Sequence, residues 1–450
     1  MVCVNKTRRR ARAQRSNRPV ATPGRRWGKV GPGYVRCVDS IVILGAGTGG
    51  TLVANRLRRS LLEHDAQIVV VDQDDRHVYQ PGLLFVPFGL AQLEEITRPR
   101  GAQLHGGIRY VQSPIERVEL EHQRVLLTDG TTLAYDVLII ATGAELVPEE
   151  TEGLTGPGWG KKVFTFYTPD GAVALHDALE RFDAGRLVVN VVDMPIKCPV
   201  APLEFCFLAD WYLRERKIRG RVELTYVTPL DGAFTTPVAS RALGGLLAEK
   251  DIAIVTEFNT GEVDGLTGRL IAYDGRVVPF DLGVVIPLHS GAGYVGRSPG
   301  LGDELNFIPT DQRTLQSKVA PNVFAIGDAA SITTSKAGSV THFEGEVMVE
   351  NVRRFLVGKG LDDSYDGHAN CFIETGFHKA LLIDFNYDTE PLPGHFPTQL
   401  GLPLLKQSRL NHLGKLMFQW FYWHTLLPGR DIPGVGSEMP HSGKRPPTES

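Results

Sequence analysis

The chain has 450 residues and a formal net charge of −3, and 42% of its residues are hydrophobic. This composition is typical of a globular protein with two or three domains and well-buried cores. No run of 18 apolar residues occurs, so no segment is expected to span a bilayer. The five cysteines are too few and too scattered for a disulfide framework, and no spacing of Cys and His predicts a metal site.

Charge is distributed unevenly along the chain. Residues 1–38 hold eleven of the 48 Lys and Arg residues and no acidic residue, which leaves 37 basic and 51 acidic residues for the remainder. This segment is rich in Pro, Gly and Arg and has no apolar periodicity, so we predict a disordered basic tail and no nucleic-acid partner. No apolar stretch follows Arg8-Arg9-Arg10, so no export signal is expected. The few scattered cysteines fit an intracellular protein with selected thiols.

The first predicted element is a buried strand over residues 39–44, followed by a glycine turn and a helix over residues 51–60. The glycines of the turn are Gly45, Gly47 and Gly50. A second apolar strand ends at Asp72. Glycines at this spacing let the backbone approach a pyrophosphate at the helix N-terminus, and the carboxylate can accept hydrogen bonds from a ribose. The pattern predicts a dinucleotide-binding fold.

Two later segments extend this pattern. One buried strand ends in Ala-Thr142-Gly143, and another ends in Gly327-Asp328-Ala. In this order the three motifs resemble the FAD-binding domain of the disulfide-reductase-like flavoproteins. The resemblance implies that FAD is the cofactor, that Asp328 holds its ribityl chain, and that Lys336 lies near the flavin ring.

The resemblance also implies an α/β fold of tandem Rossmann-like domains in which the FAD-binding domain is discontinuous. The expected segments are a basic tail (1–38), the first part of the FAD-binding domain (39–150), a second Rossmann-like domain without a glycine motif (151–284), the second part of the FAD-binding domain (285–380), a C-terminal quinone and membrane segment (381–430) and a flexible tail (431–450).

The second Rossmann-like domain is not expected to bind a nicotinamide dinucleotide. Relatives that oxidise NAD(P)H carry a second glycine motif after the first strand of this domain. Here that strand, residues 185–193, leads into Met194–Glu204, where prolines replace the glycines. Proline has no N–H to offer, and its ring keeps the backbone away from a pyrophosphate. The turn presents Cys198 instead.

Cys198 is predicted to lie at a strand-to-helix turn, where a helix dipole can lower a thiol pKa. The segments Lys-Cys-Pro-Val-Ala-Pro-Leu-Glu, ending at Glu204, and Cys-Phe-Ile-Glu-Thr-Gly, starting at Cys371, are similar to the redox-cysteine segments of sulfide:quinone oxidoreductases. This resemblance covers about residues 39–430. It implies that Cys198 and Cys371 form a redox pair, and that Glu204 acts as an acid/base or tunes the thiol. Cys206 is expected to be inert core.

The chain departs from the family pattern in two places. Many members carry a third cysteine before the Ala-Thr-Gly motif, whereas this chain has none between Cys37 and Cys198. We therefore expect FAD to be bound without a covalent bond. The loop over residues 228–237 also lacks a histidine that some relatives carry there.

The C-terminal segment combines apolar, aromatic and cationic residues at helical spacing. The apolar residues are Leu413, Leu416, Met417, Trp420, Trp423 and Leu427, and the cations are Lys406, Arg409 and Lys415. Such aromatic-rich amphipathic segments suit the bilayer interface; a core or oligomer-interface helix is the alternative. The resemblance favours monotopic membrane attachment, with quinone entering near Phe421, Tyr422 and Trp423. Deletion from about residue 402 onward should then leave a soluble, flavin-loaded core.

Taken together, the resemblance implies a sulfide:quinone oxidoreductase that passes electrons from sulfide through the cysteine pair and FAD to membrane quinone. It would sit peripherally on the cytoplasmic membrane, on a side that the sequence does not define, and a homo-oligomer is left open. A type II NADH:quinone oxidoreductase is disfavoured by the missing second glycine motif. The flavoprotein subunit of a sulfide dehydrogenase that serves a cytochrome is disfavoured by the absent export signal. A redox-silent FAD-binding interaction protein is the remaining alternative.

Overall fold

The computed structural model describes residues 27–29, 34–36, 39–431 and 436–445. Most of the predicted basic tail, with Cys3 and Cys37, lies outside these described residues. The part described forms two short strands, β1 (Trp27–Lys29) and β2 (Tyr34–Arg36), which pair with each other.

A five-stranded parallel sheet forms the first lobe of the molecule, with the strand order β23-β11-β3-β4-β7. Its strands are β3 (Asp39–Leu44), β4 (Ala66–Asp72), β7 (Ile108–Gln112), β11 (Val137–Ile140) and β23 (Val323–Ala325). The strands β3 and β11 are buried on both faces, as parallel strands between two layers must be. Because β23 comes from far downstream of β11, the sheet is assembled from two separate parts of the chain, which confirms the expected discontinuous fold.

The two faces of this sheet are covered differently. The helices α1 (Thr48–Ser60) and α6 (Gly338–Leu356) pack against each other on one face. An antiparallel sheet of β8 (Ile115–Glu119), β9 (Arg124–Leu127) and β10 (Thr132–Ala134) covers the other face. Its residues Val118 and Val125 pack in one cluster with Val42 and Leu44 of β3.

The second lobe contains another five-stranded parallel sheet, with the order β13-β20-β14-β15-β16. Its strands are β13 (Val163–Phe164), β14 (Gly185–Val191), β15 (Val222–Val227), β16 (Ala253–Val255) and β20 (Leu282–Ile286), and its helices are α2 (Pro169–Arg181), α3 (Ala201–Glu215) and α4 (Pro237–Glu249). The antiparallel strands β17 (Thr260–Asp264), β18 (Arg269–Ala272) and β19 (Val277–Pro279) form a separate sheet. Its residues Val263 and Leu270 pack in one cluster with Val188 of β14 and Val285 of β20. Strand β20 crosses the boundary expected between residues 284 and 285, since it pairs with β14 along its whole length.

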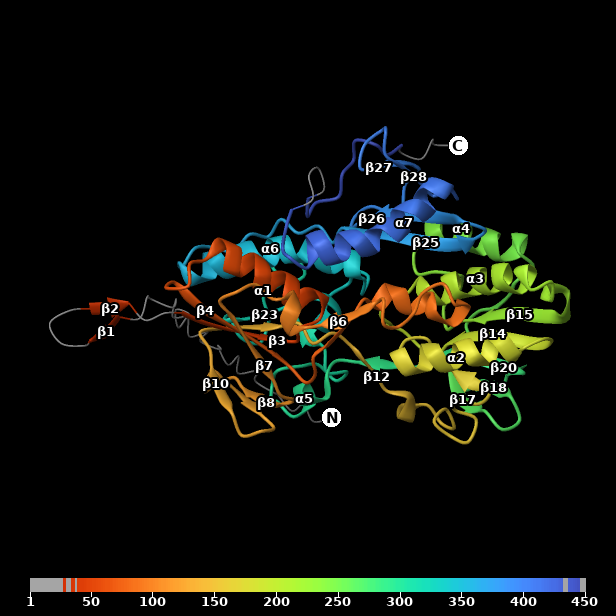
Figure 1. Cartoon of the computed structure of the whole chain (residues 1–450), viewed down its shortest axis with the longest axis horizontal. Helices are drawn as coiled ribbons and strands as arrows, with labels where there is room; N and C mark the ends of the chain where they lie inside the picture. The colour runs from red at the N-terminus through yellow and green to blue at the C-terminus, as the bar shows by residue number, and fades with distance from the viewer. Residues whose placement is uncertain (1–26, 30–33, 37–38, 432–435, 446–450) are drawn as a thin grey trace, which may run out of the picture.

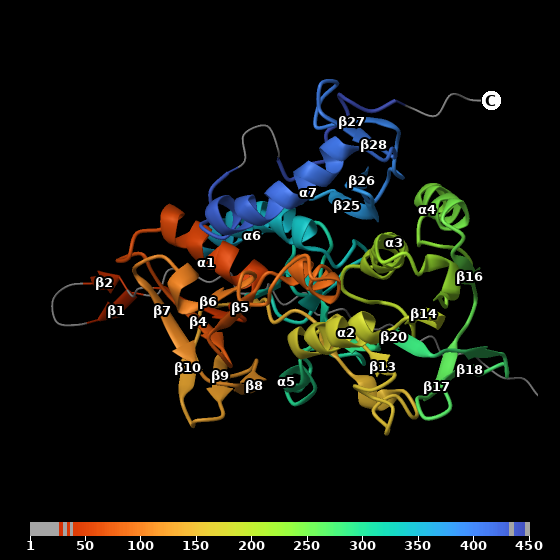
Figure 2. The ribbon, with the colours of Figure 1, turned by 45° about the vertical axis from the view of Figure 1, so that its right-hand side comes forward.

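The C-terminal part lies across both lobes (Figures 1 and 2). The hairpin of β25 (Ala369–Gly376) and β26 (Lys379–Phe385) packs against α3, and α7 (Arg409–Phe421) packs on the hairpin. The side chain of Ser408 caps α7 by accepting a hydrogen bond from the Asn411 N–H at 3.0 Å. A π-helical turn, Tyr422–Leu426, follows. Within the described part of the chain, every helix is too short or too polar to cross a bilayer.

The segment 436–445 does not match the expected flexible tail. The side chain of Met439 is buried, and Lys444 forms a buried ion pair with Asp384 of β26. Lys444 also makes a β-bridge to Gly394 in β27 (Gly394–Phe396), the partner strand of β28 (Leu402–Leu404). The prediction of a flexible tail was wrong because it relied on the few apolar residues of this segment. The segment is held in part by the ion pair between Lys444 and the buried carboxylate of Asp384, which the sequence pattern does not reveal.

Candidate active site

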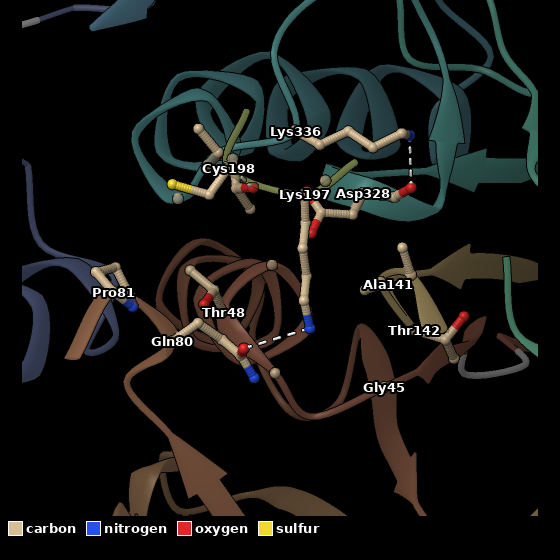
Figure 3. Close-up of a pocket in the computed structure, with 18 of the residues that line it drawn as sticks. Gly45, Thr48, Gln80, Pro81, Ala141, Thr142, Lys197, Cys198, Asp328 and Lys336 are labelled. Atoms are coloured by element: carbon tan, nitrogen blue, oxygen red, sulfur yellow. Dashed lines mark hydrogen bonds between the residues drawn. The ribbon is translucent and has the colours of Figure 1, made fainter. Parts of the chain in front are cut away.

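A cavity of about 650 Å³ extends from the glycine turn after β3 to the inner side of α7. Its walls come from the first lobe, the second lobe and the C-terminal part, so residues that are distant in the sequence meet there. Figure 3 shows part of it, with Gly45 and Thr48 on one side and Asp328, Lys336 and Cys198 on the other.

The glycine turn has the geometry that a dinucleotide requires. Gly45 has a φ of +97°, and a Cβ there would lie 2.4 Å from the Ala141 carbonyl oxygen. A Cβ on Gly50 would lie 1.8 Å from the Gly45 oxygen, whereas a Cβ on Gly47 would meet nothing within 4 Å. The first and third glycines therefore allow the turn to pack against β11 and α1. The second leaves open space at the helix N-terminus, where phosphate binds well.

Asp72 at the end of β4 is held in place by three partners. Its carboxylate accepts hydrogen bonds from the N–H groups of Ala46, at 2.7 Å, and Gln73, at 2.8 Å. Arg100 lies 3.1 Å away and also lines the cavity. Burial raises the pKa of Asp72, and these partners offset only part of that effect. Sequence reasoning missed Arg100, because an arginine outside any motif carries no signal.

The other two motifs line the same cavity. Thr142 and Gly143 follow β11, and the Thr142 hydroxyl lies 3.4 Å from the Tyr294 hydroxyl. Asp328 is desolvated, which raises its pKa. The ammonium of Lys336 donates to the carbonyl oxygens of Asp328, at 2.7 Å, and Ala330, at 3.0 Å (Figure 3). Lys336 therefore stabilises the Gly-Asp-Ala turn while it lines the cavity, and its predicted place beside the flavin ring stays a prediction.

Two further groups in this region were not predicted. Glu344 of α6 is buried below the Gly-Asp-Ala turn and accepts a hydrogen bond from the Gly327 N–H at 2.6 Å. Burial raises its pKa to about 7. Lys197 reaches from the second lobe across the cavity, and its ammonium lies 3.5 Å from the side-chain oxygen of Gln80 (Figure 3).

These observations fit FAD. The space left at Gly47 and the N–H groups at the start of α1 suit the pyrophosphate, and the cavity continues past Asp328 to the cysteines. Bound there, FAD would supply a two-electron acceptor that can also pass electrons on.

Cys198 and Cys371 line the same cavity although 173 residues separate them. Cys198 lies just before α3 with a φ of +47°, and its N–H donates to the Lys336 carbonyl oxygen at 2.6 Å. Its own carbonyl accepts a hydrogen bond from the Tyr167 hydroxyl at 3.1 Å. Cys371 is on β25, and both cysteines are free thiols in the structure. Cys206 is fully buried in the core, as expected.

The thiol pKa values are shifted in the direction opposite to the one expected from the helix dipole. Burial raises the pKa of Cys198 well above its ordinary value and raises that of Cys371 to about 12. The negative charge of Glu204 adds to both increases, and the positive charge of Lys415 opposes them. The prediction of a low pKa was wrong because desolvation at this depth outweighs a dipole that acts within one helical turn.

Glu204 forms a buried ion pair with Lys415. Its carboxylate also accepts a hydrogen bond from the Glu374 N–H at 2.7 Å, and Lys415 donates to the Phe372 carbonyl oxygen at 3.2 Å. Burial raises the pKa of Glu204. Lys415, one of the cations of the C-terminal segment, is thus directed inward to this carboxylate.

The aromatic residues predicted to meet quinone are mostly covered. Tyr422 and Trp423 are buried, and Phe421 is half-buried. Arg98 lies over the Trp423 ring at 4.3 Å, and Tyr422 lines the cavity, as does Phe418. Trp423 and Leu427 therefore do not belong to an exposed face. The apolar residues of α7 that are exposed are Leu410, Leu413, Leu416, Met417 and Trp420.

The two sheets and the cavity that crosses them define an FAD-dependent oxidoreductase built like the disulfide reductases. The family described as pyridine nucleotide-disulphide oxidoreductase matches residues 39–190. The mitochondrial sulfide:quinone oxidoreductase of Mus musculus is 26% identical over 396 residues, which covers 86% of each chain. That of Schizosaccharomyces pombe is 27% identical over 412 residues, covering 85% of this chain and 89% of the other.

The crystal structure of the sulfide:quinone oxidoreductase from Aquifex aeolicus has a TM-score of 0.74 to this structure at 19% sequence identity, and the match covers 87% of this chain and 92% of that one. Over most of its length the chain is similar to the sulfide:quinone oxidoreductases, and its cofactor is FAD.

Proposed function

We propose that the protein oxidises sulfide and reduces a membrane quinone, with Cys198 and Cys371 as the redox pair. The observation that carries this proposal is that Cys198 of the second lobe and Cys371 of the C-terminal part both line the cavity that starts at the FAD-binding glycine turn. The relatives named above share this activity in name, and they match the chain over most of its length.

In the oxidised enzyme the two cysteines form a disulfide. Hydrosulfide attacks one sulfur, the S–S bond breaks, and the products are a persulfide on one cysteine and a thiolate on the other. FAD, when bound at the glycine turn, would accept the electron pair left on the thiolate and supply it to quinone. A second sulfur nucleophile then attacks the outer sulfur of the persulfide, the S–S bond breaks, and that cysteine leaves as a thiolate. As the electron pair is lost from the two cysteines, they form the disulfide again. The net reaction converts hydrosulfide, one proton and quinone into one sulfur at the oxidation level of the element and one quinol.

The charges beside the cysteines fit this step. A thiolate forms at a buried position, where burial alone would keep the sulfur protonated. The ammonium of Lys415 is the cation whose charge lowers the pKa of both thiols, so it stabilises the leaving thiolate. Glu204 is the carboxylate that holds Lys415 in place, and it can accept or return a proton there.

We further propose that the enzyme lies on the membrane surface through α7. Five large apolar side chains of this helix are exposed on one side, and together they form an unusually apolar surface for a water-facing helix. On the other side of the same helix, Lys415 and Phe418 line the cavity. A quinone that leaves the bilayer at α7 would therefore have a short way to the active site.

The test of this function is anaerobic mixing of the flavin-loaded protein with sulfide, followed by a soluble ubiquinone analogue. Sulfide should bleach the flavin absorbance, and the quinone analogue should restore it. Absence of bleaching by sulfide would leave an FAD-binding protein without this activity.

A further inference from the structure

Two acid–base pairs connect the cavity with the surface of α7. The inner pair is Lys415 and Glu204. The outer pair is His412, one helical turn before Lys415, and Glu374 of β25; the Nδ1 atom of His412 lies 2.9 and 3.0 Å from the two carboxylate oxygens of Glu374. The pairs are linked because the Glu374 N–H donates to the same Glu204 oxygen that Lys415 contacts.

Solvent reaches this arrangement at one end. The His412 side chain is 20% exposed, whereas Glu374 is 1% exposed. The inner pair is buried as well, with 9% exposure for Lys415 and 2% for Glu204. A buried carboxylate that faces a solvent-accessible imidazole is a common arrangement for moving protons, because the imidazole exchanges with water at neutral pH.

The two pairs also interact electrostatically. Burial on its own would lower the pKa of Lys415, but the negative charges of Glu204 and Glu374 outweigh this effect and raise it. The charge of Glu374 in the outer pair is therefore coupled to Lys415 in the inner pair.

The proposed reaction needs such a connection. Reduction of a quinone to a quinol takes two protons, and one hydrosulfide releases only one. Each turnover must therefore take one proton from solvent. A quinone that enters from the bilayer has hydrocarbon on its outer side, so the proton has to arrive through the protein.

We propose that His412 and Glu374 form the solvent end of a proton route that leads to the Lys415–Glu204 pair in the cavity. This inference rests on the proposed function. Protonated His412 passes a proton to the carboxylate of Glu374, which supplies it to the Lys415–Glu204 pair. Lys415 then donates a proton to the reduced quinone. His412 and Glu374 do not contact the substrate; they supply protons to the group that does.

The experiment separates the two half-reactions by stopped-flow spectroscopy of the flavin-loaded full chain. His412→Gln should leave the rate of flavin reduction by sulfide unchanged. It should slow flavin reoxidation by a soluble ubiquinone analogue by about a hundredfold or more, which is within the range for loss of a proton-transfer group. Added imidazole should restore much of this rate. A merely structural defect would not respond to imidazole. His424→Gln, at an exposed histidine of the π-helical turn after α7, is the matched control and should behave like the parent enzyme.

Equal reoxidation rates in His412→Gln and the parent enzyme would overturn the route. The route would also be overturned if His412→Gln were slow, were not rescued by imidazole and lost reduction by sulfide as well. That result would indicate a packing defect. Failure of sulfide to reduce the parent flavin would instead contradict the proposed function. Glu374→Gln, which keeps the size of the side chain, should reproduce the slow reoxidation without imidazole rescue, because the defect then lies beyond the imidazole.

Discussion

The hydroxyl of Tyr422 lies 2.7 Å from the Nε2 atom of His77 and 2.8 Å from the Thr48 hydroxyl. Burial lowers the pKa of His77 to about 3, so its ring is neutral. The Nδ1 atom, 3.1 Å from the Ala46 carbonyl oxygen, must carry the proton, because a carbonyl only accepts. Tyr422 therefore donates to His77 and accepts from Thr48. This chain of hydrogen bonds fixes the C-terminal segment to the FAD-binding turn.

Tyr422→Phe should destabilise the protein by about 1–3 kcal/mol, since it leaves buried polar groups of His77 and Thr48 without their partner. Denaturant unfolding of the flavin-loaded protein measures this loss. Tyr273→Phe is the matched control, because Tyr273 is 84% exposed, and it should change stability very little. An unaltered unfolding midpoint for Tyr422→Phe would contradict the hydrogen-bond chain.

Cys198→Ala and Cys371→Ala should each reduce sulfide-dependent flavin reduction by at least about a thousandfold, because removal of either cysteine prevents the disulfide. Both variants should retain FAD, and the double variant should be no worse than either single one. Cys206→Ala should keep near-normal activity with a modest loss of stability from the cavity it creates. Near-normal turnover by Cys371→Ala would disprove the pairing and make Cys206 the next partner to test.

The sequence was informative wherever a local pattern determines the backbone. The glycines of the first turn, Asp72 and the Gly-Asp-Ala turn form a common cavity because strand, turn and helix follow one another directly in the chain. The pairs that span the lobes were not predictable. Lys415 has the same sequence context as a surface cation, and only the packing of α7 on β25 directs it to Glu204.

The same limitation affects the C-terminal truncation. The sequence led us to expect a soluble core after deletion from residue 402, but Tyr422, Leu426 and Leu427 are buried in the main core. Deletion would expose that core and remove the hydrogen bonds to the FAD-binding turn. Surface substitutions are therefore the appropriate test of membrane attachment.

Leu413→Asp combined with Leu416→Asp should weaken binding to phospholipid vesicles by at least about tenfold, since two leucines would no longer be buried in the interface. Each of these side chains is about half exposed, so folding should tolerate the change. Co-sedimentation with vesicles measures the binding. Leu266→Asp, at an exposed leucine in the turn after β17, is the control and should bind like the parent. Unchanged binding by the double variant would place the membrane contact elsewhere.

NADH and NADPH should not reduce the flavin at a useful rate, because Met194–Glu204 has prolines where a dinucleotide needs glycines and N–H donors. Anaerobic addition of stoichiometric NADH, monitored by flavin absorbance, tests this. Rapid bleaching would favour an NADH:quinone oxidoreductase.

Acid precipitation of the flavin-loaded protein should release all of the flavin, since no cysteine lies between Cys37 and Cys198. Flavin kept in the pellet would indicate a covalent bond.

Glu344 should make the stability of the protein depend on pH. Burial raises its pKa from 4.5 to about 7 in the folded state, which corresponds to about 3 kcal/mol between the two protonation states. Below pH 4.5 the carboxyl is neutral in both the folded and the unfolded chain. As the pH rises toward 7, the unfolded chain ionises first, so the folded state loses stability over this interval.

Glu344→Gln can still accept the hydrogen bond from Gly327 but cannot ionise. The free energy of unfolding of the parent, relative to this variant, should therefore fall by up to about 3 kcal/mol between pH 4.5 and pH 8. Parallel pH profiles for the two proteins would show that Glu344 does not titrate in this range.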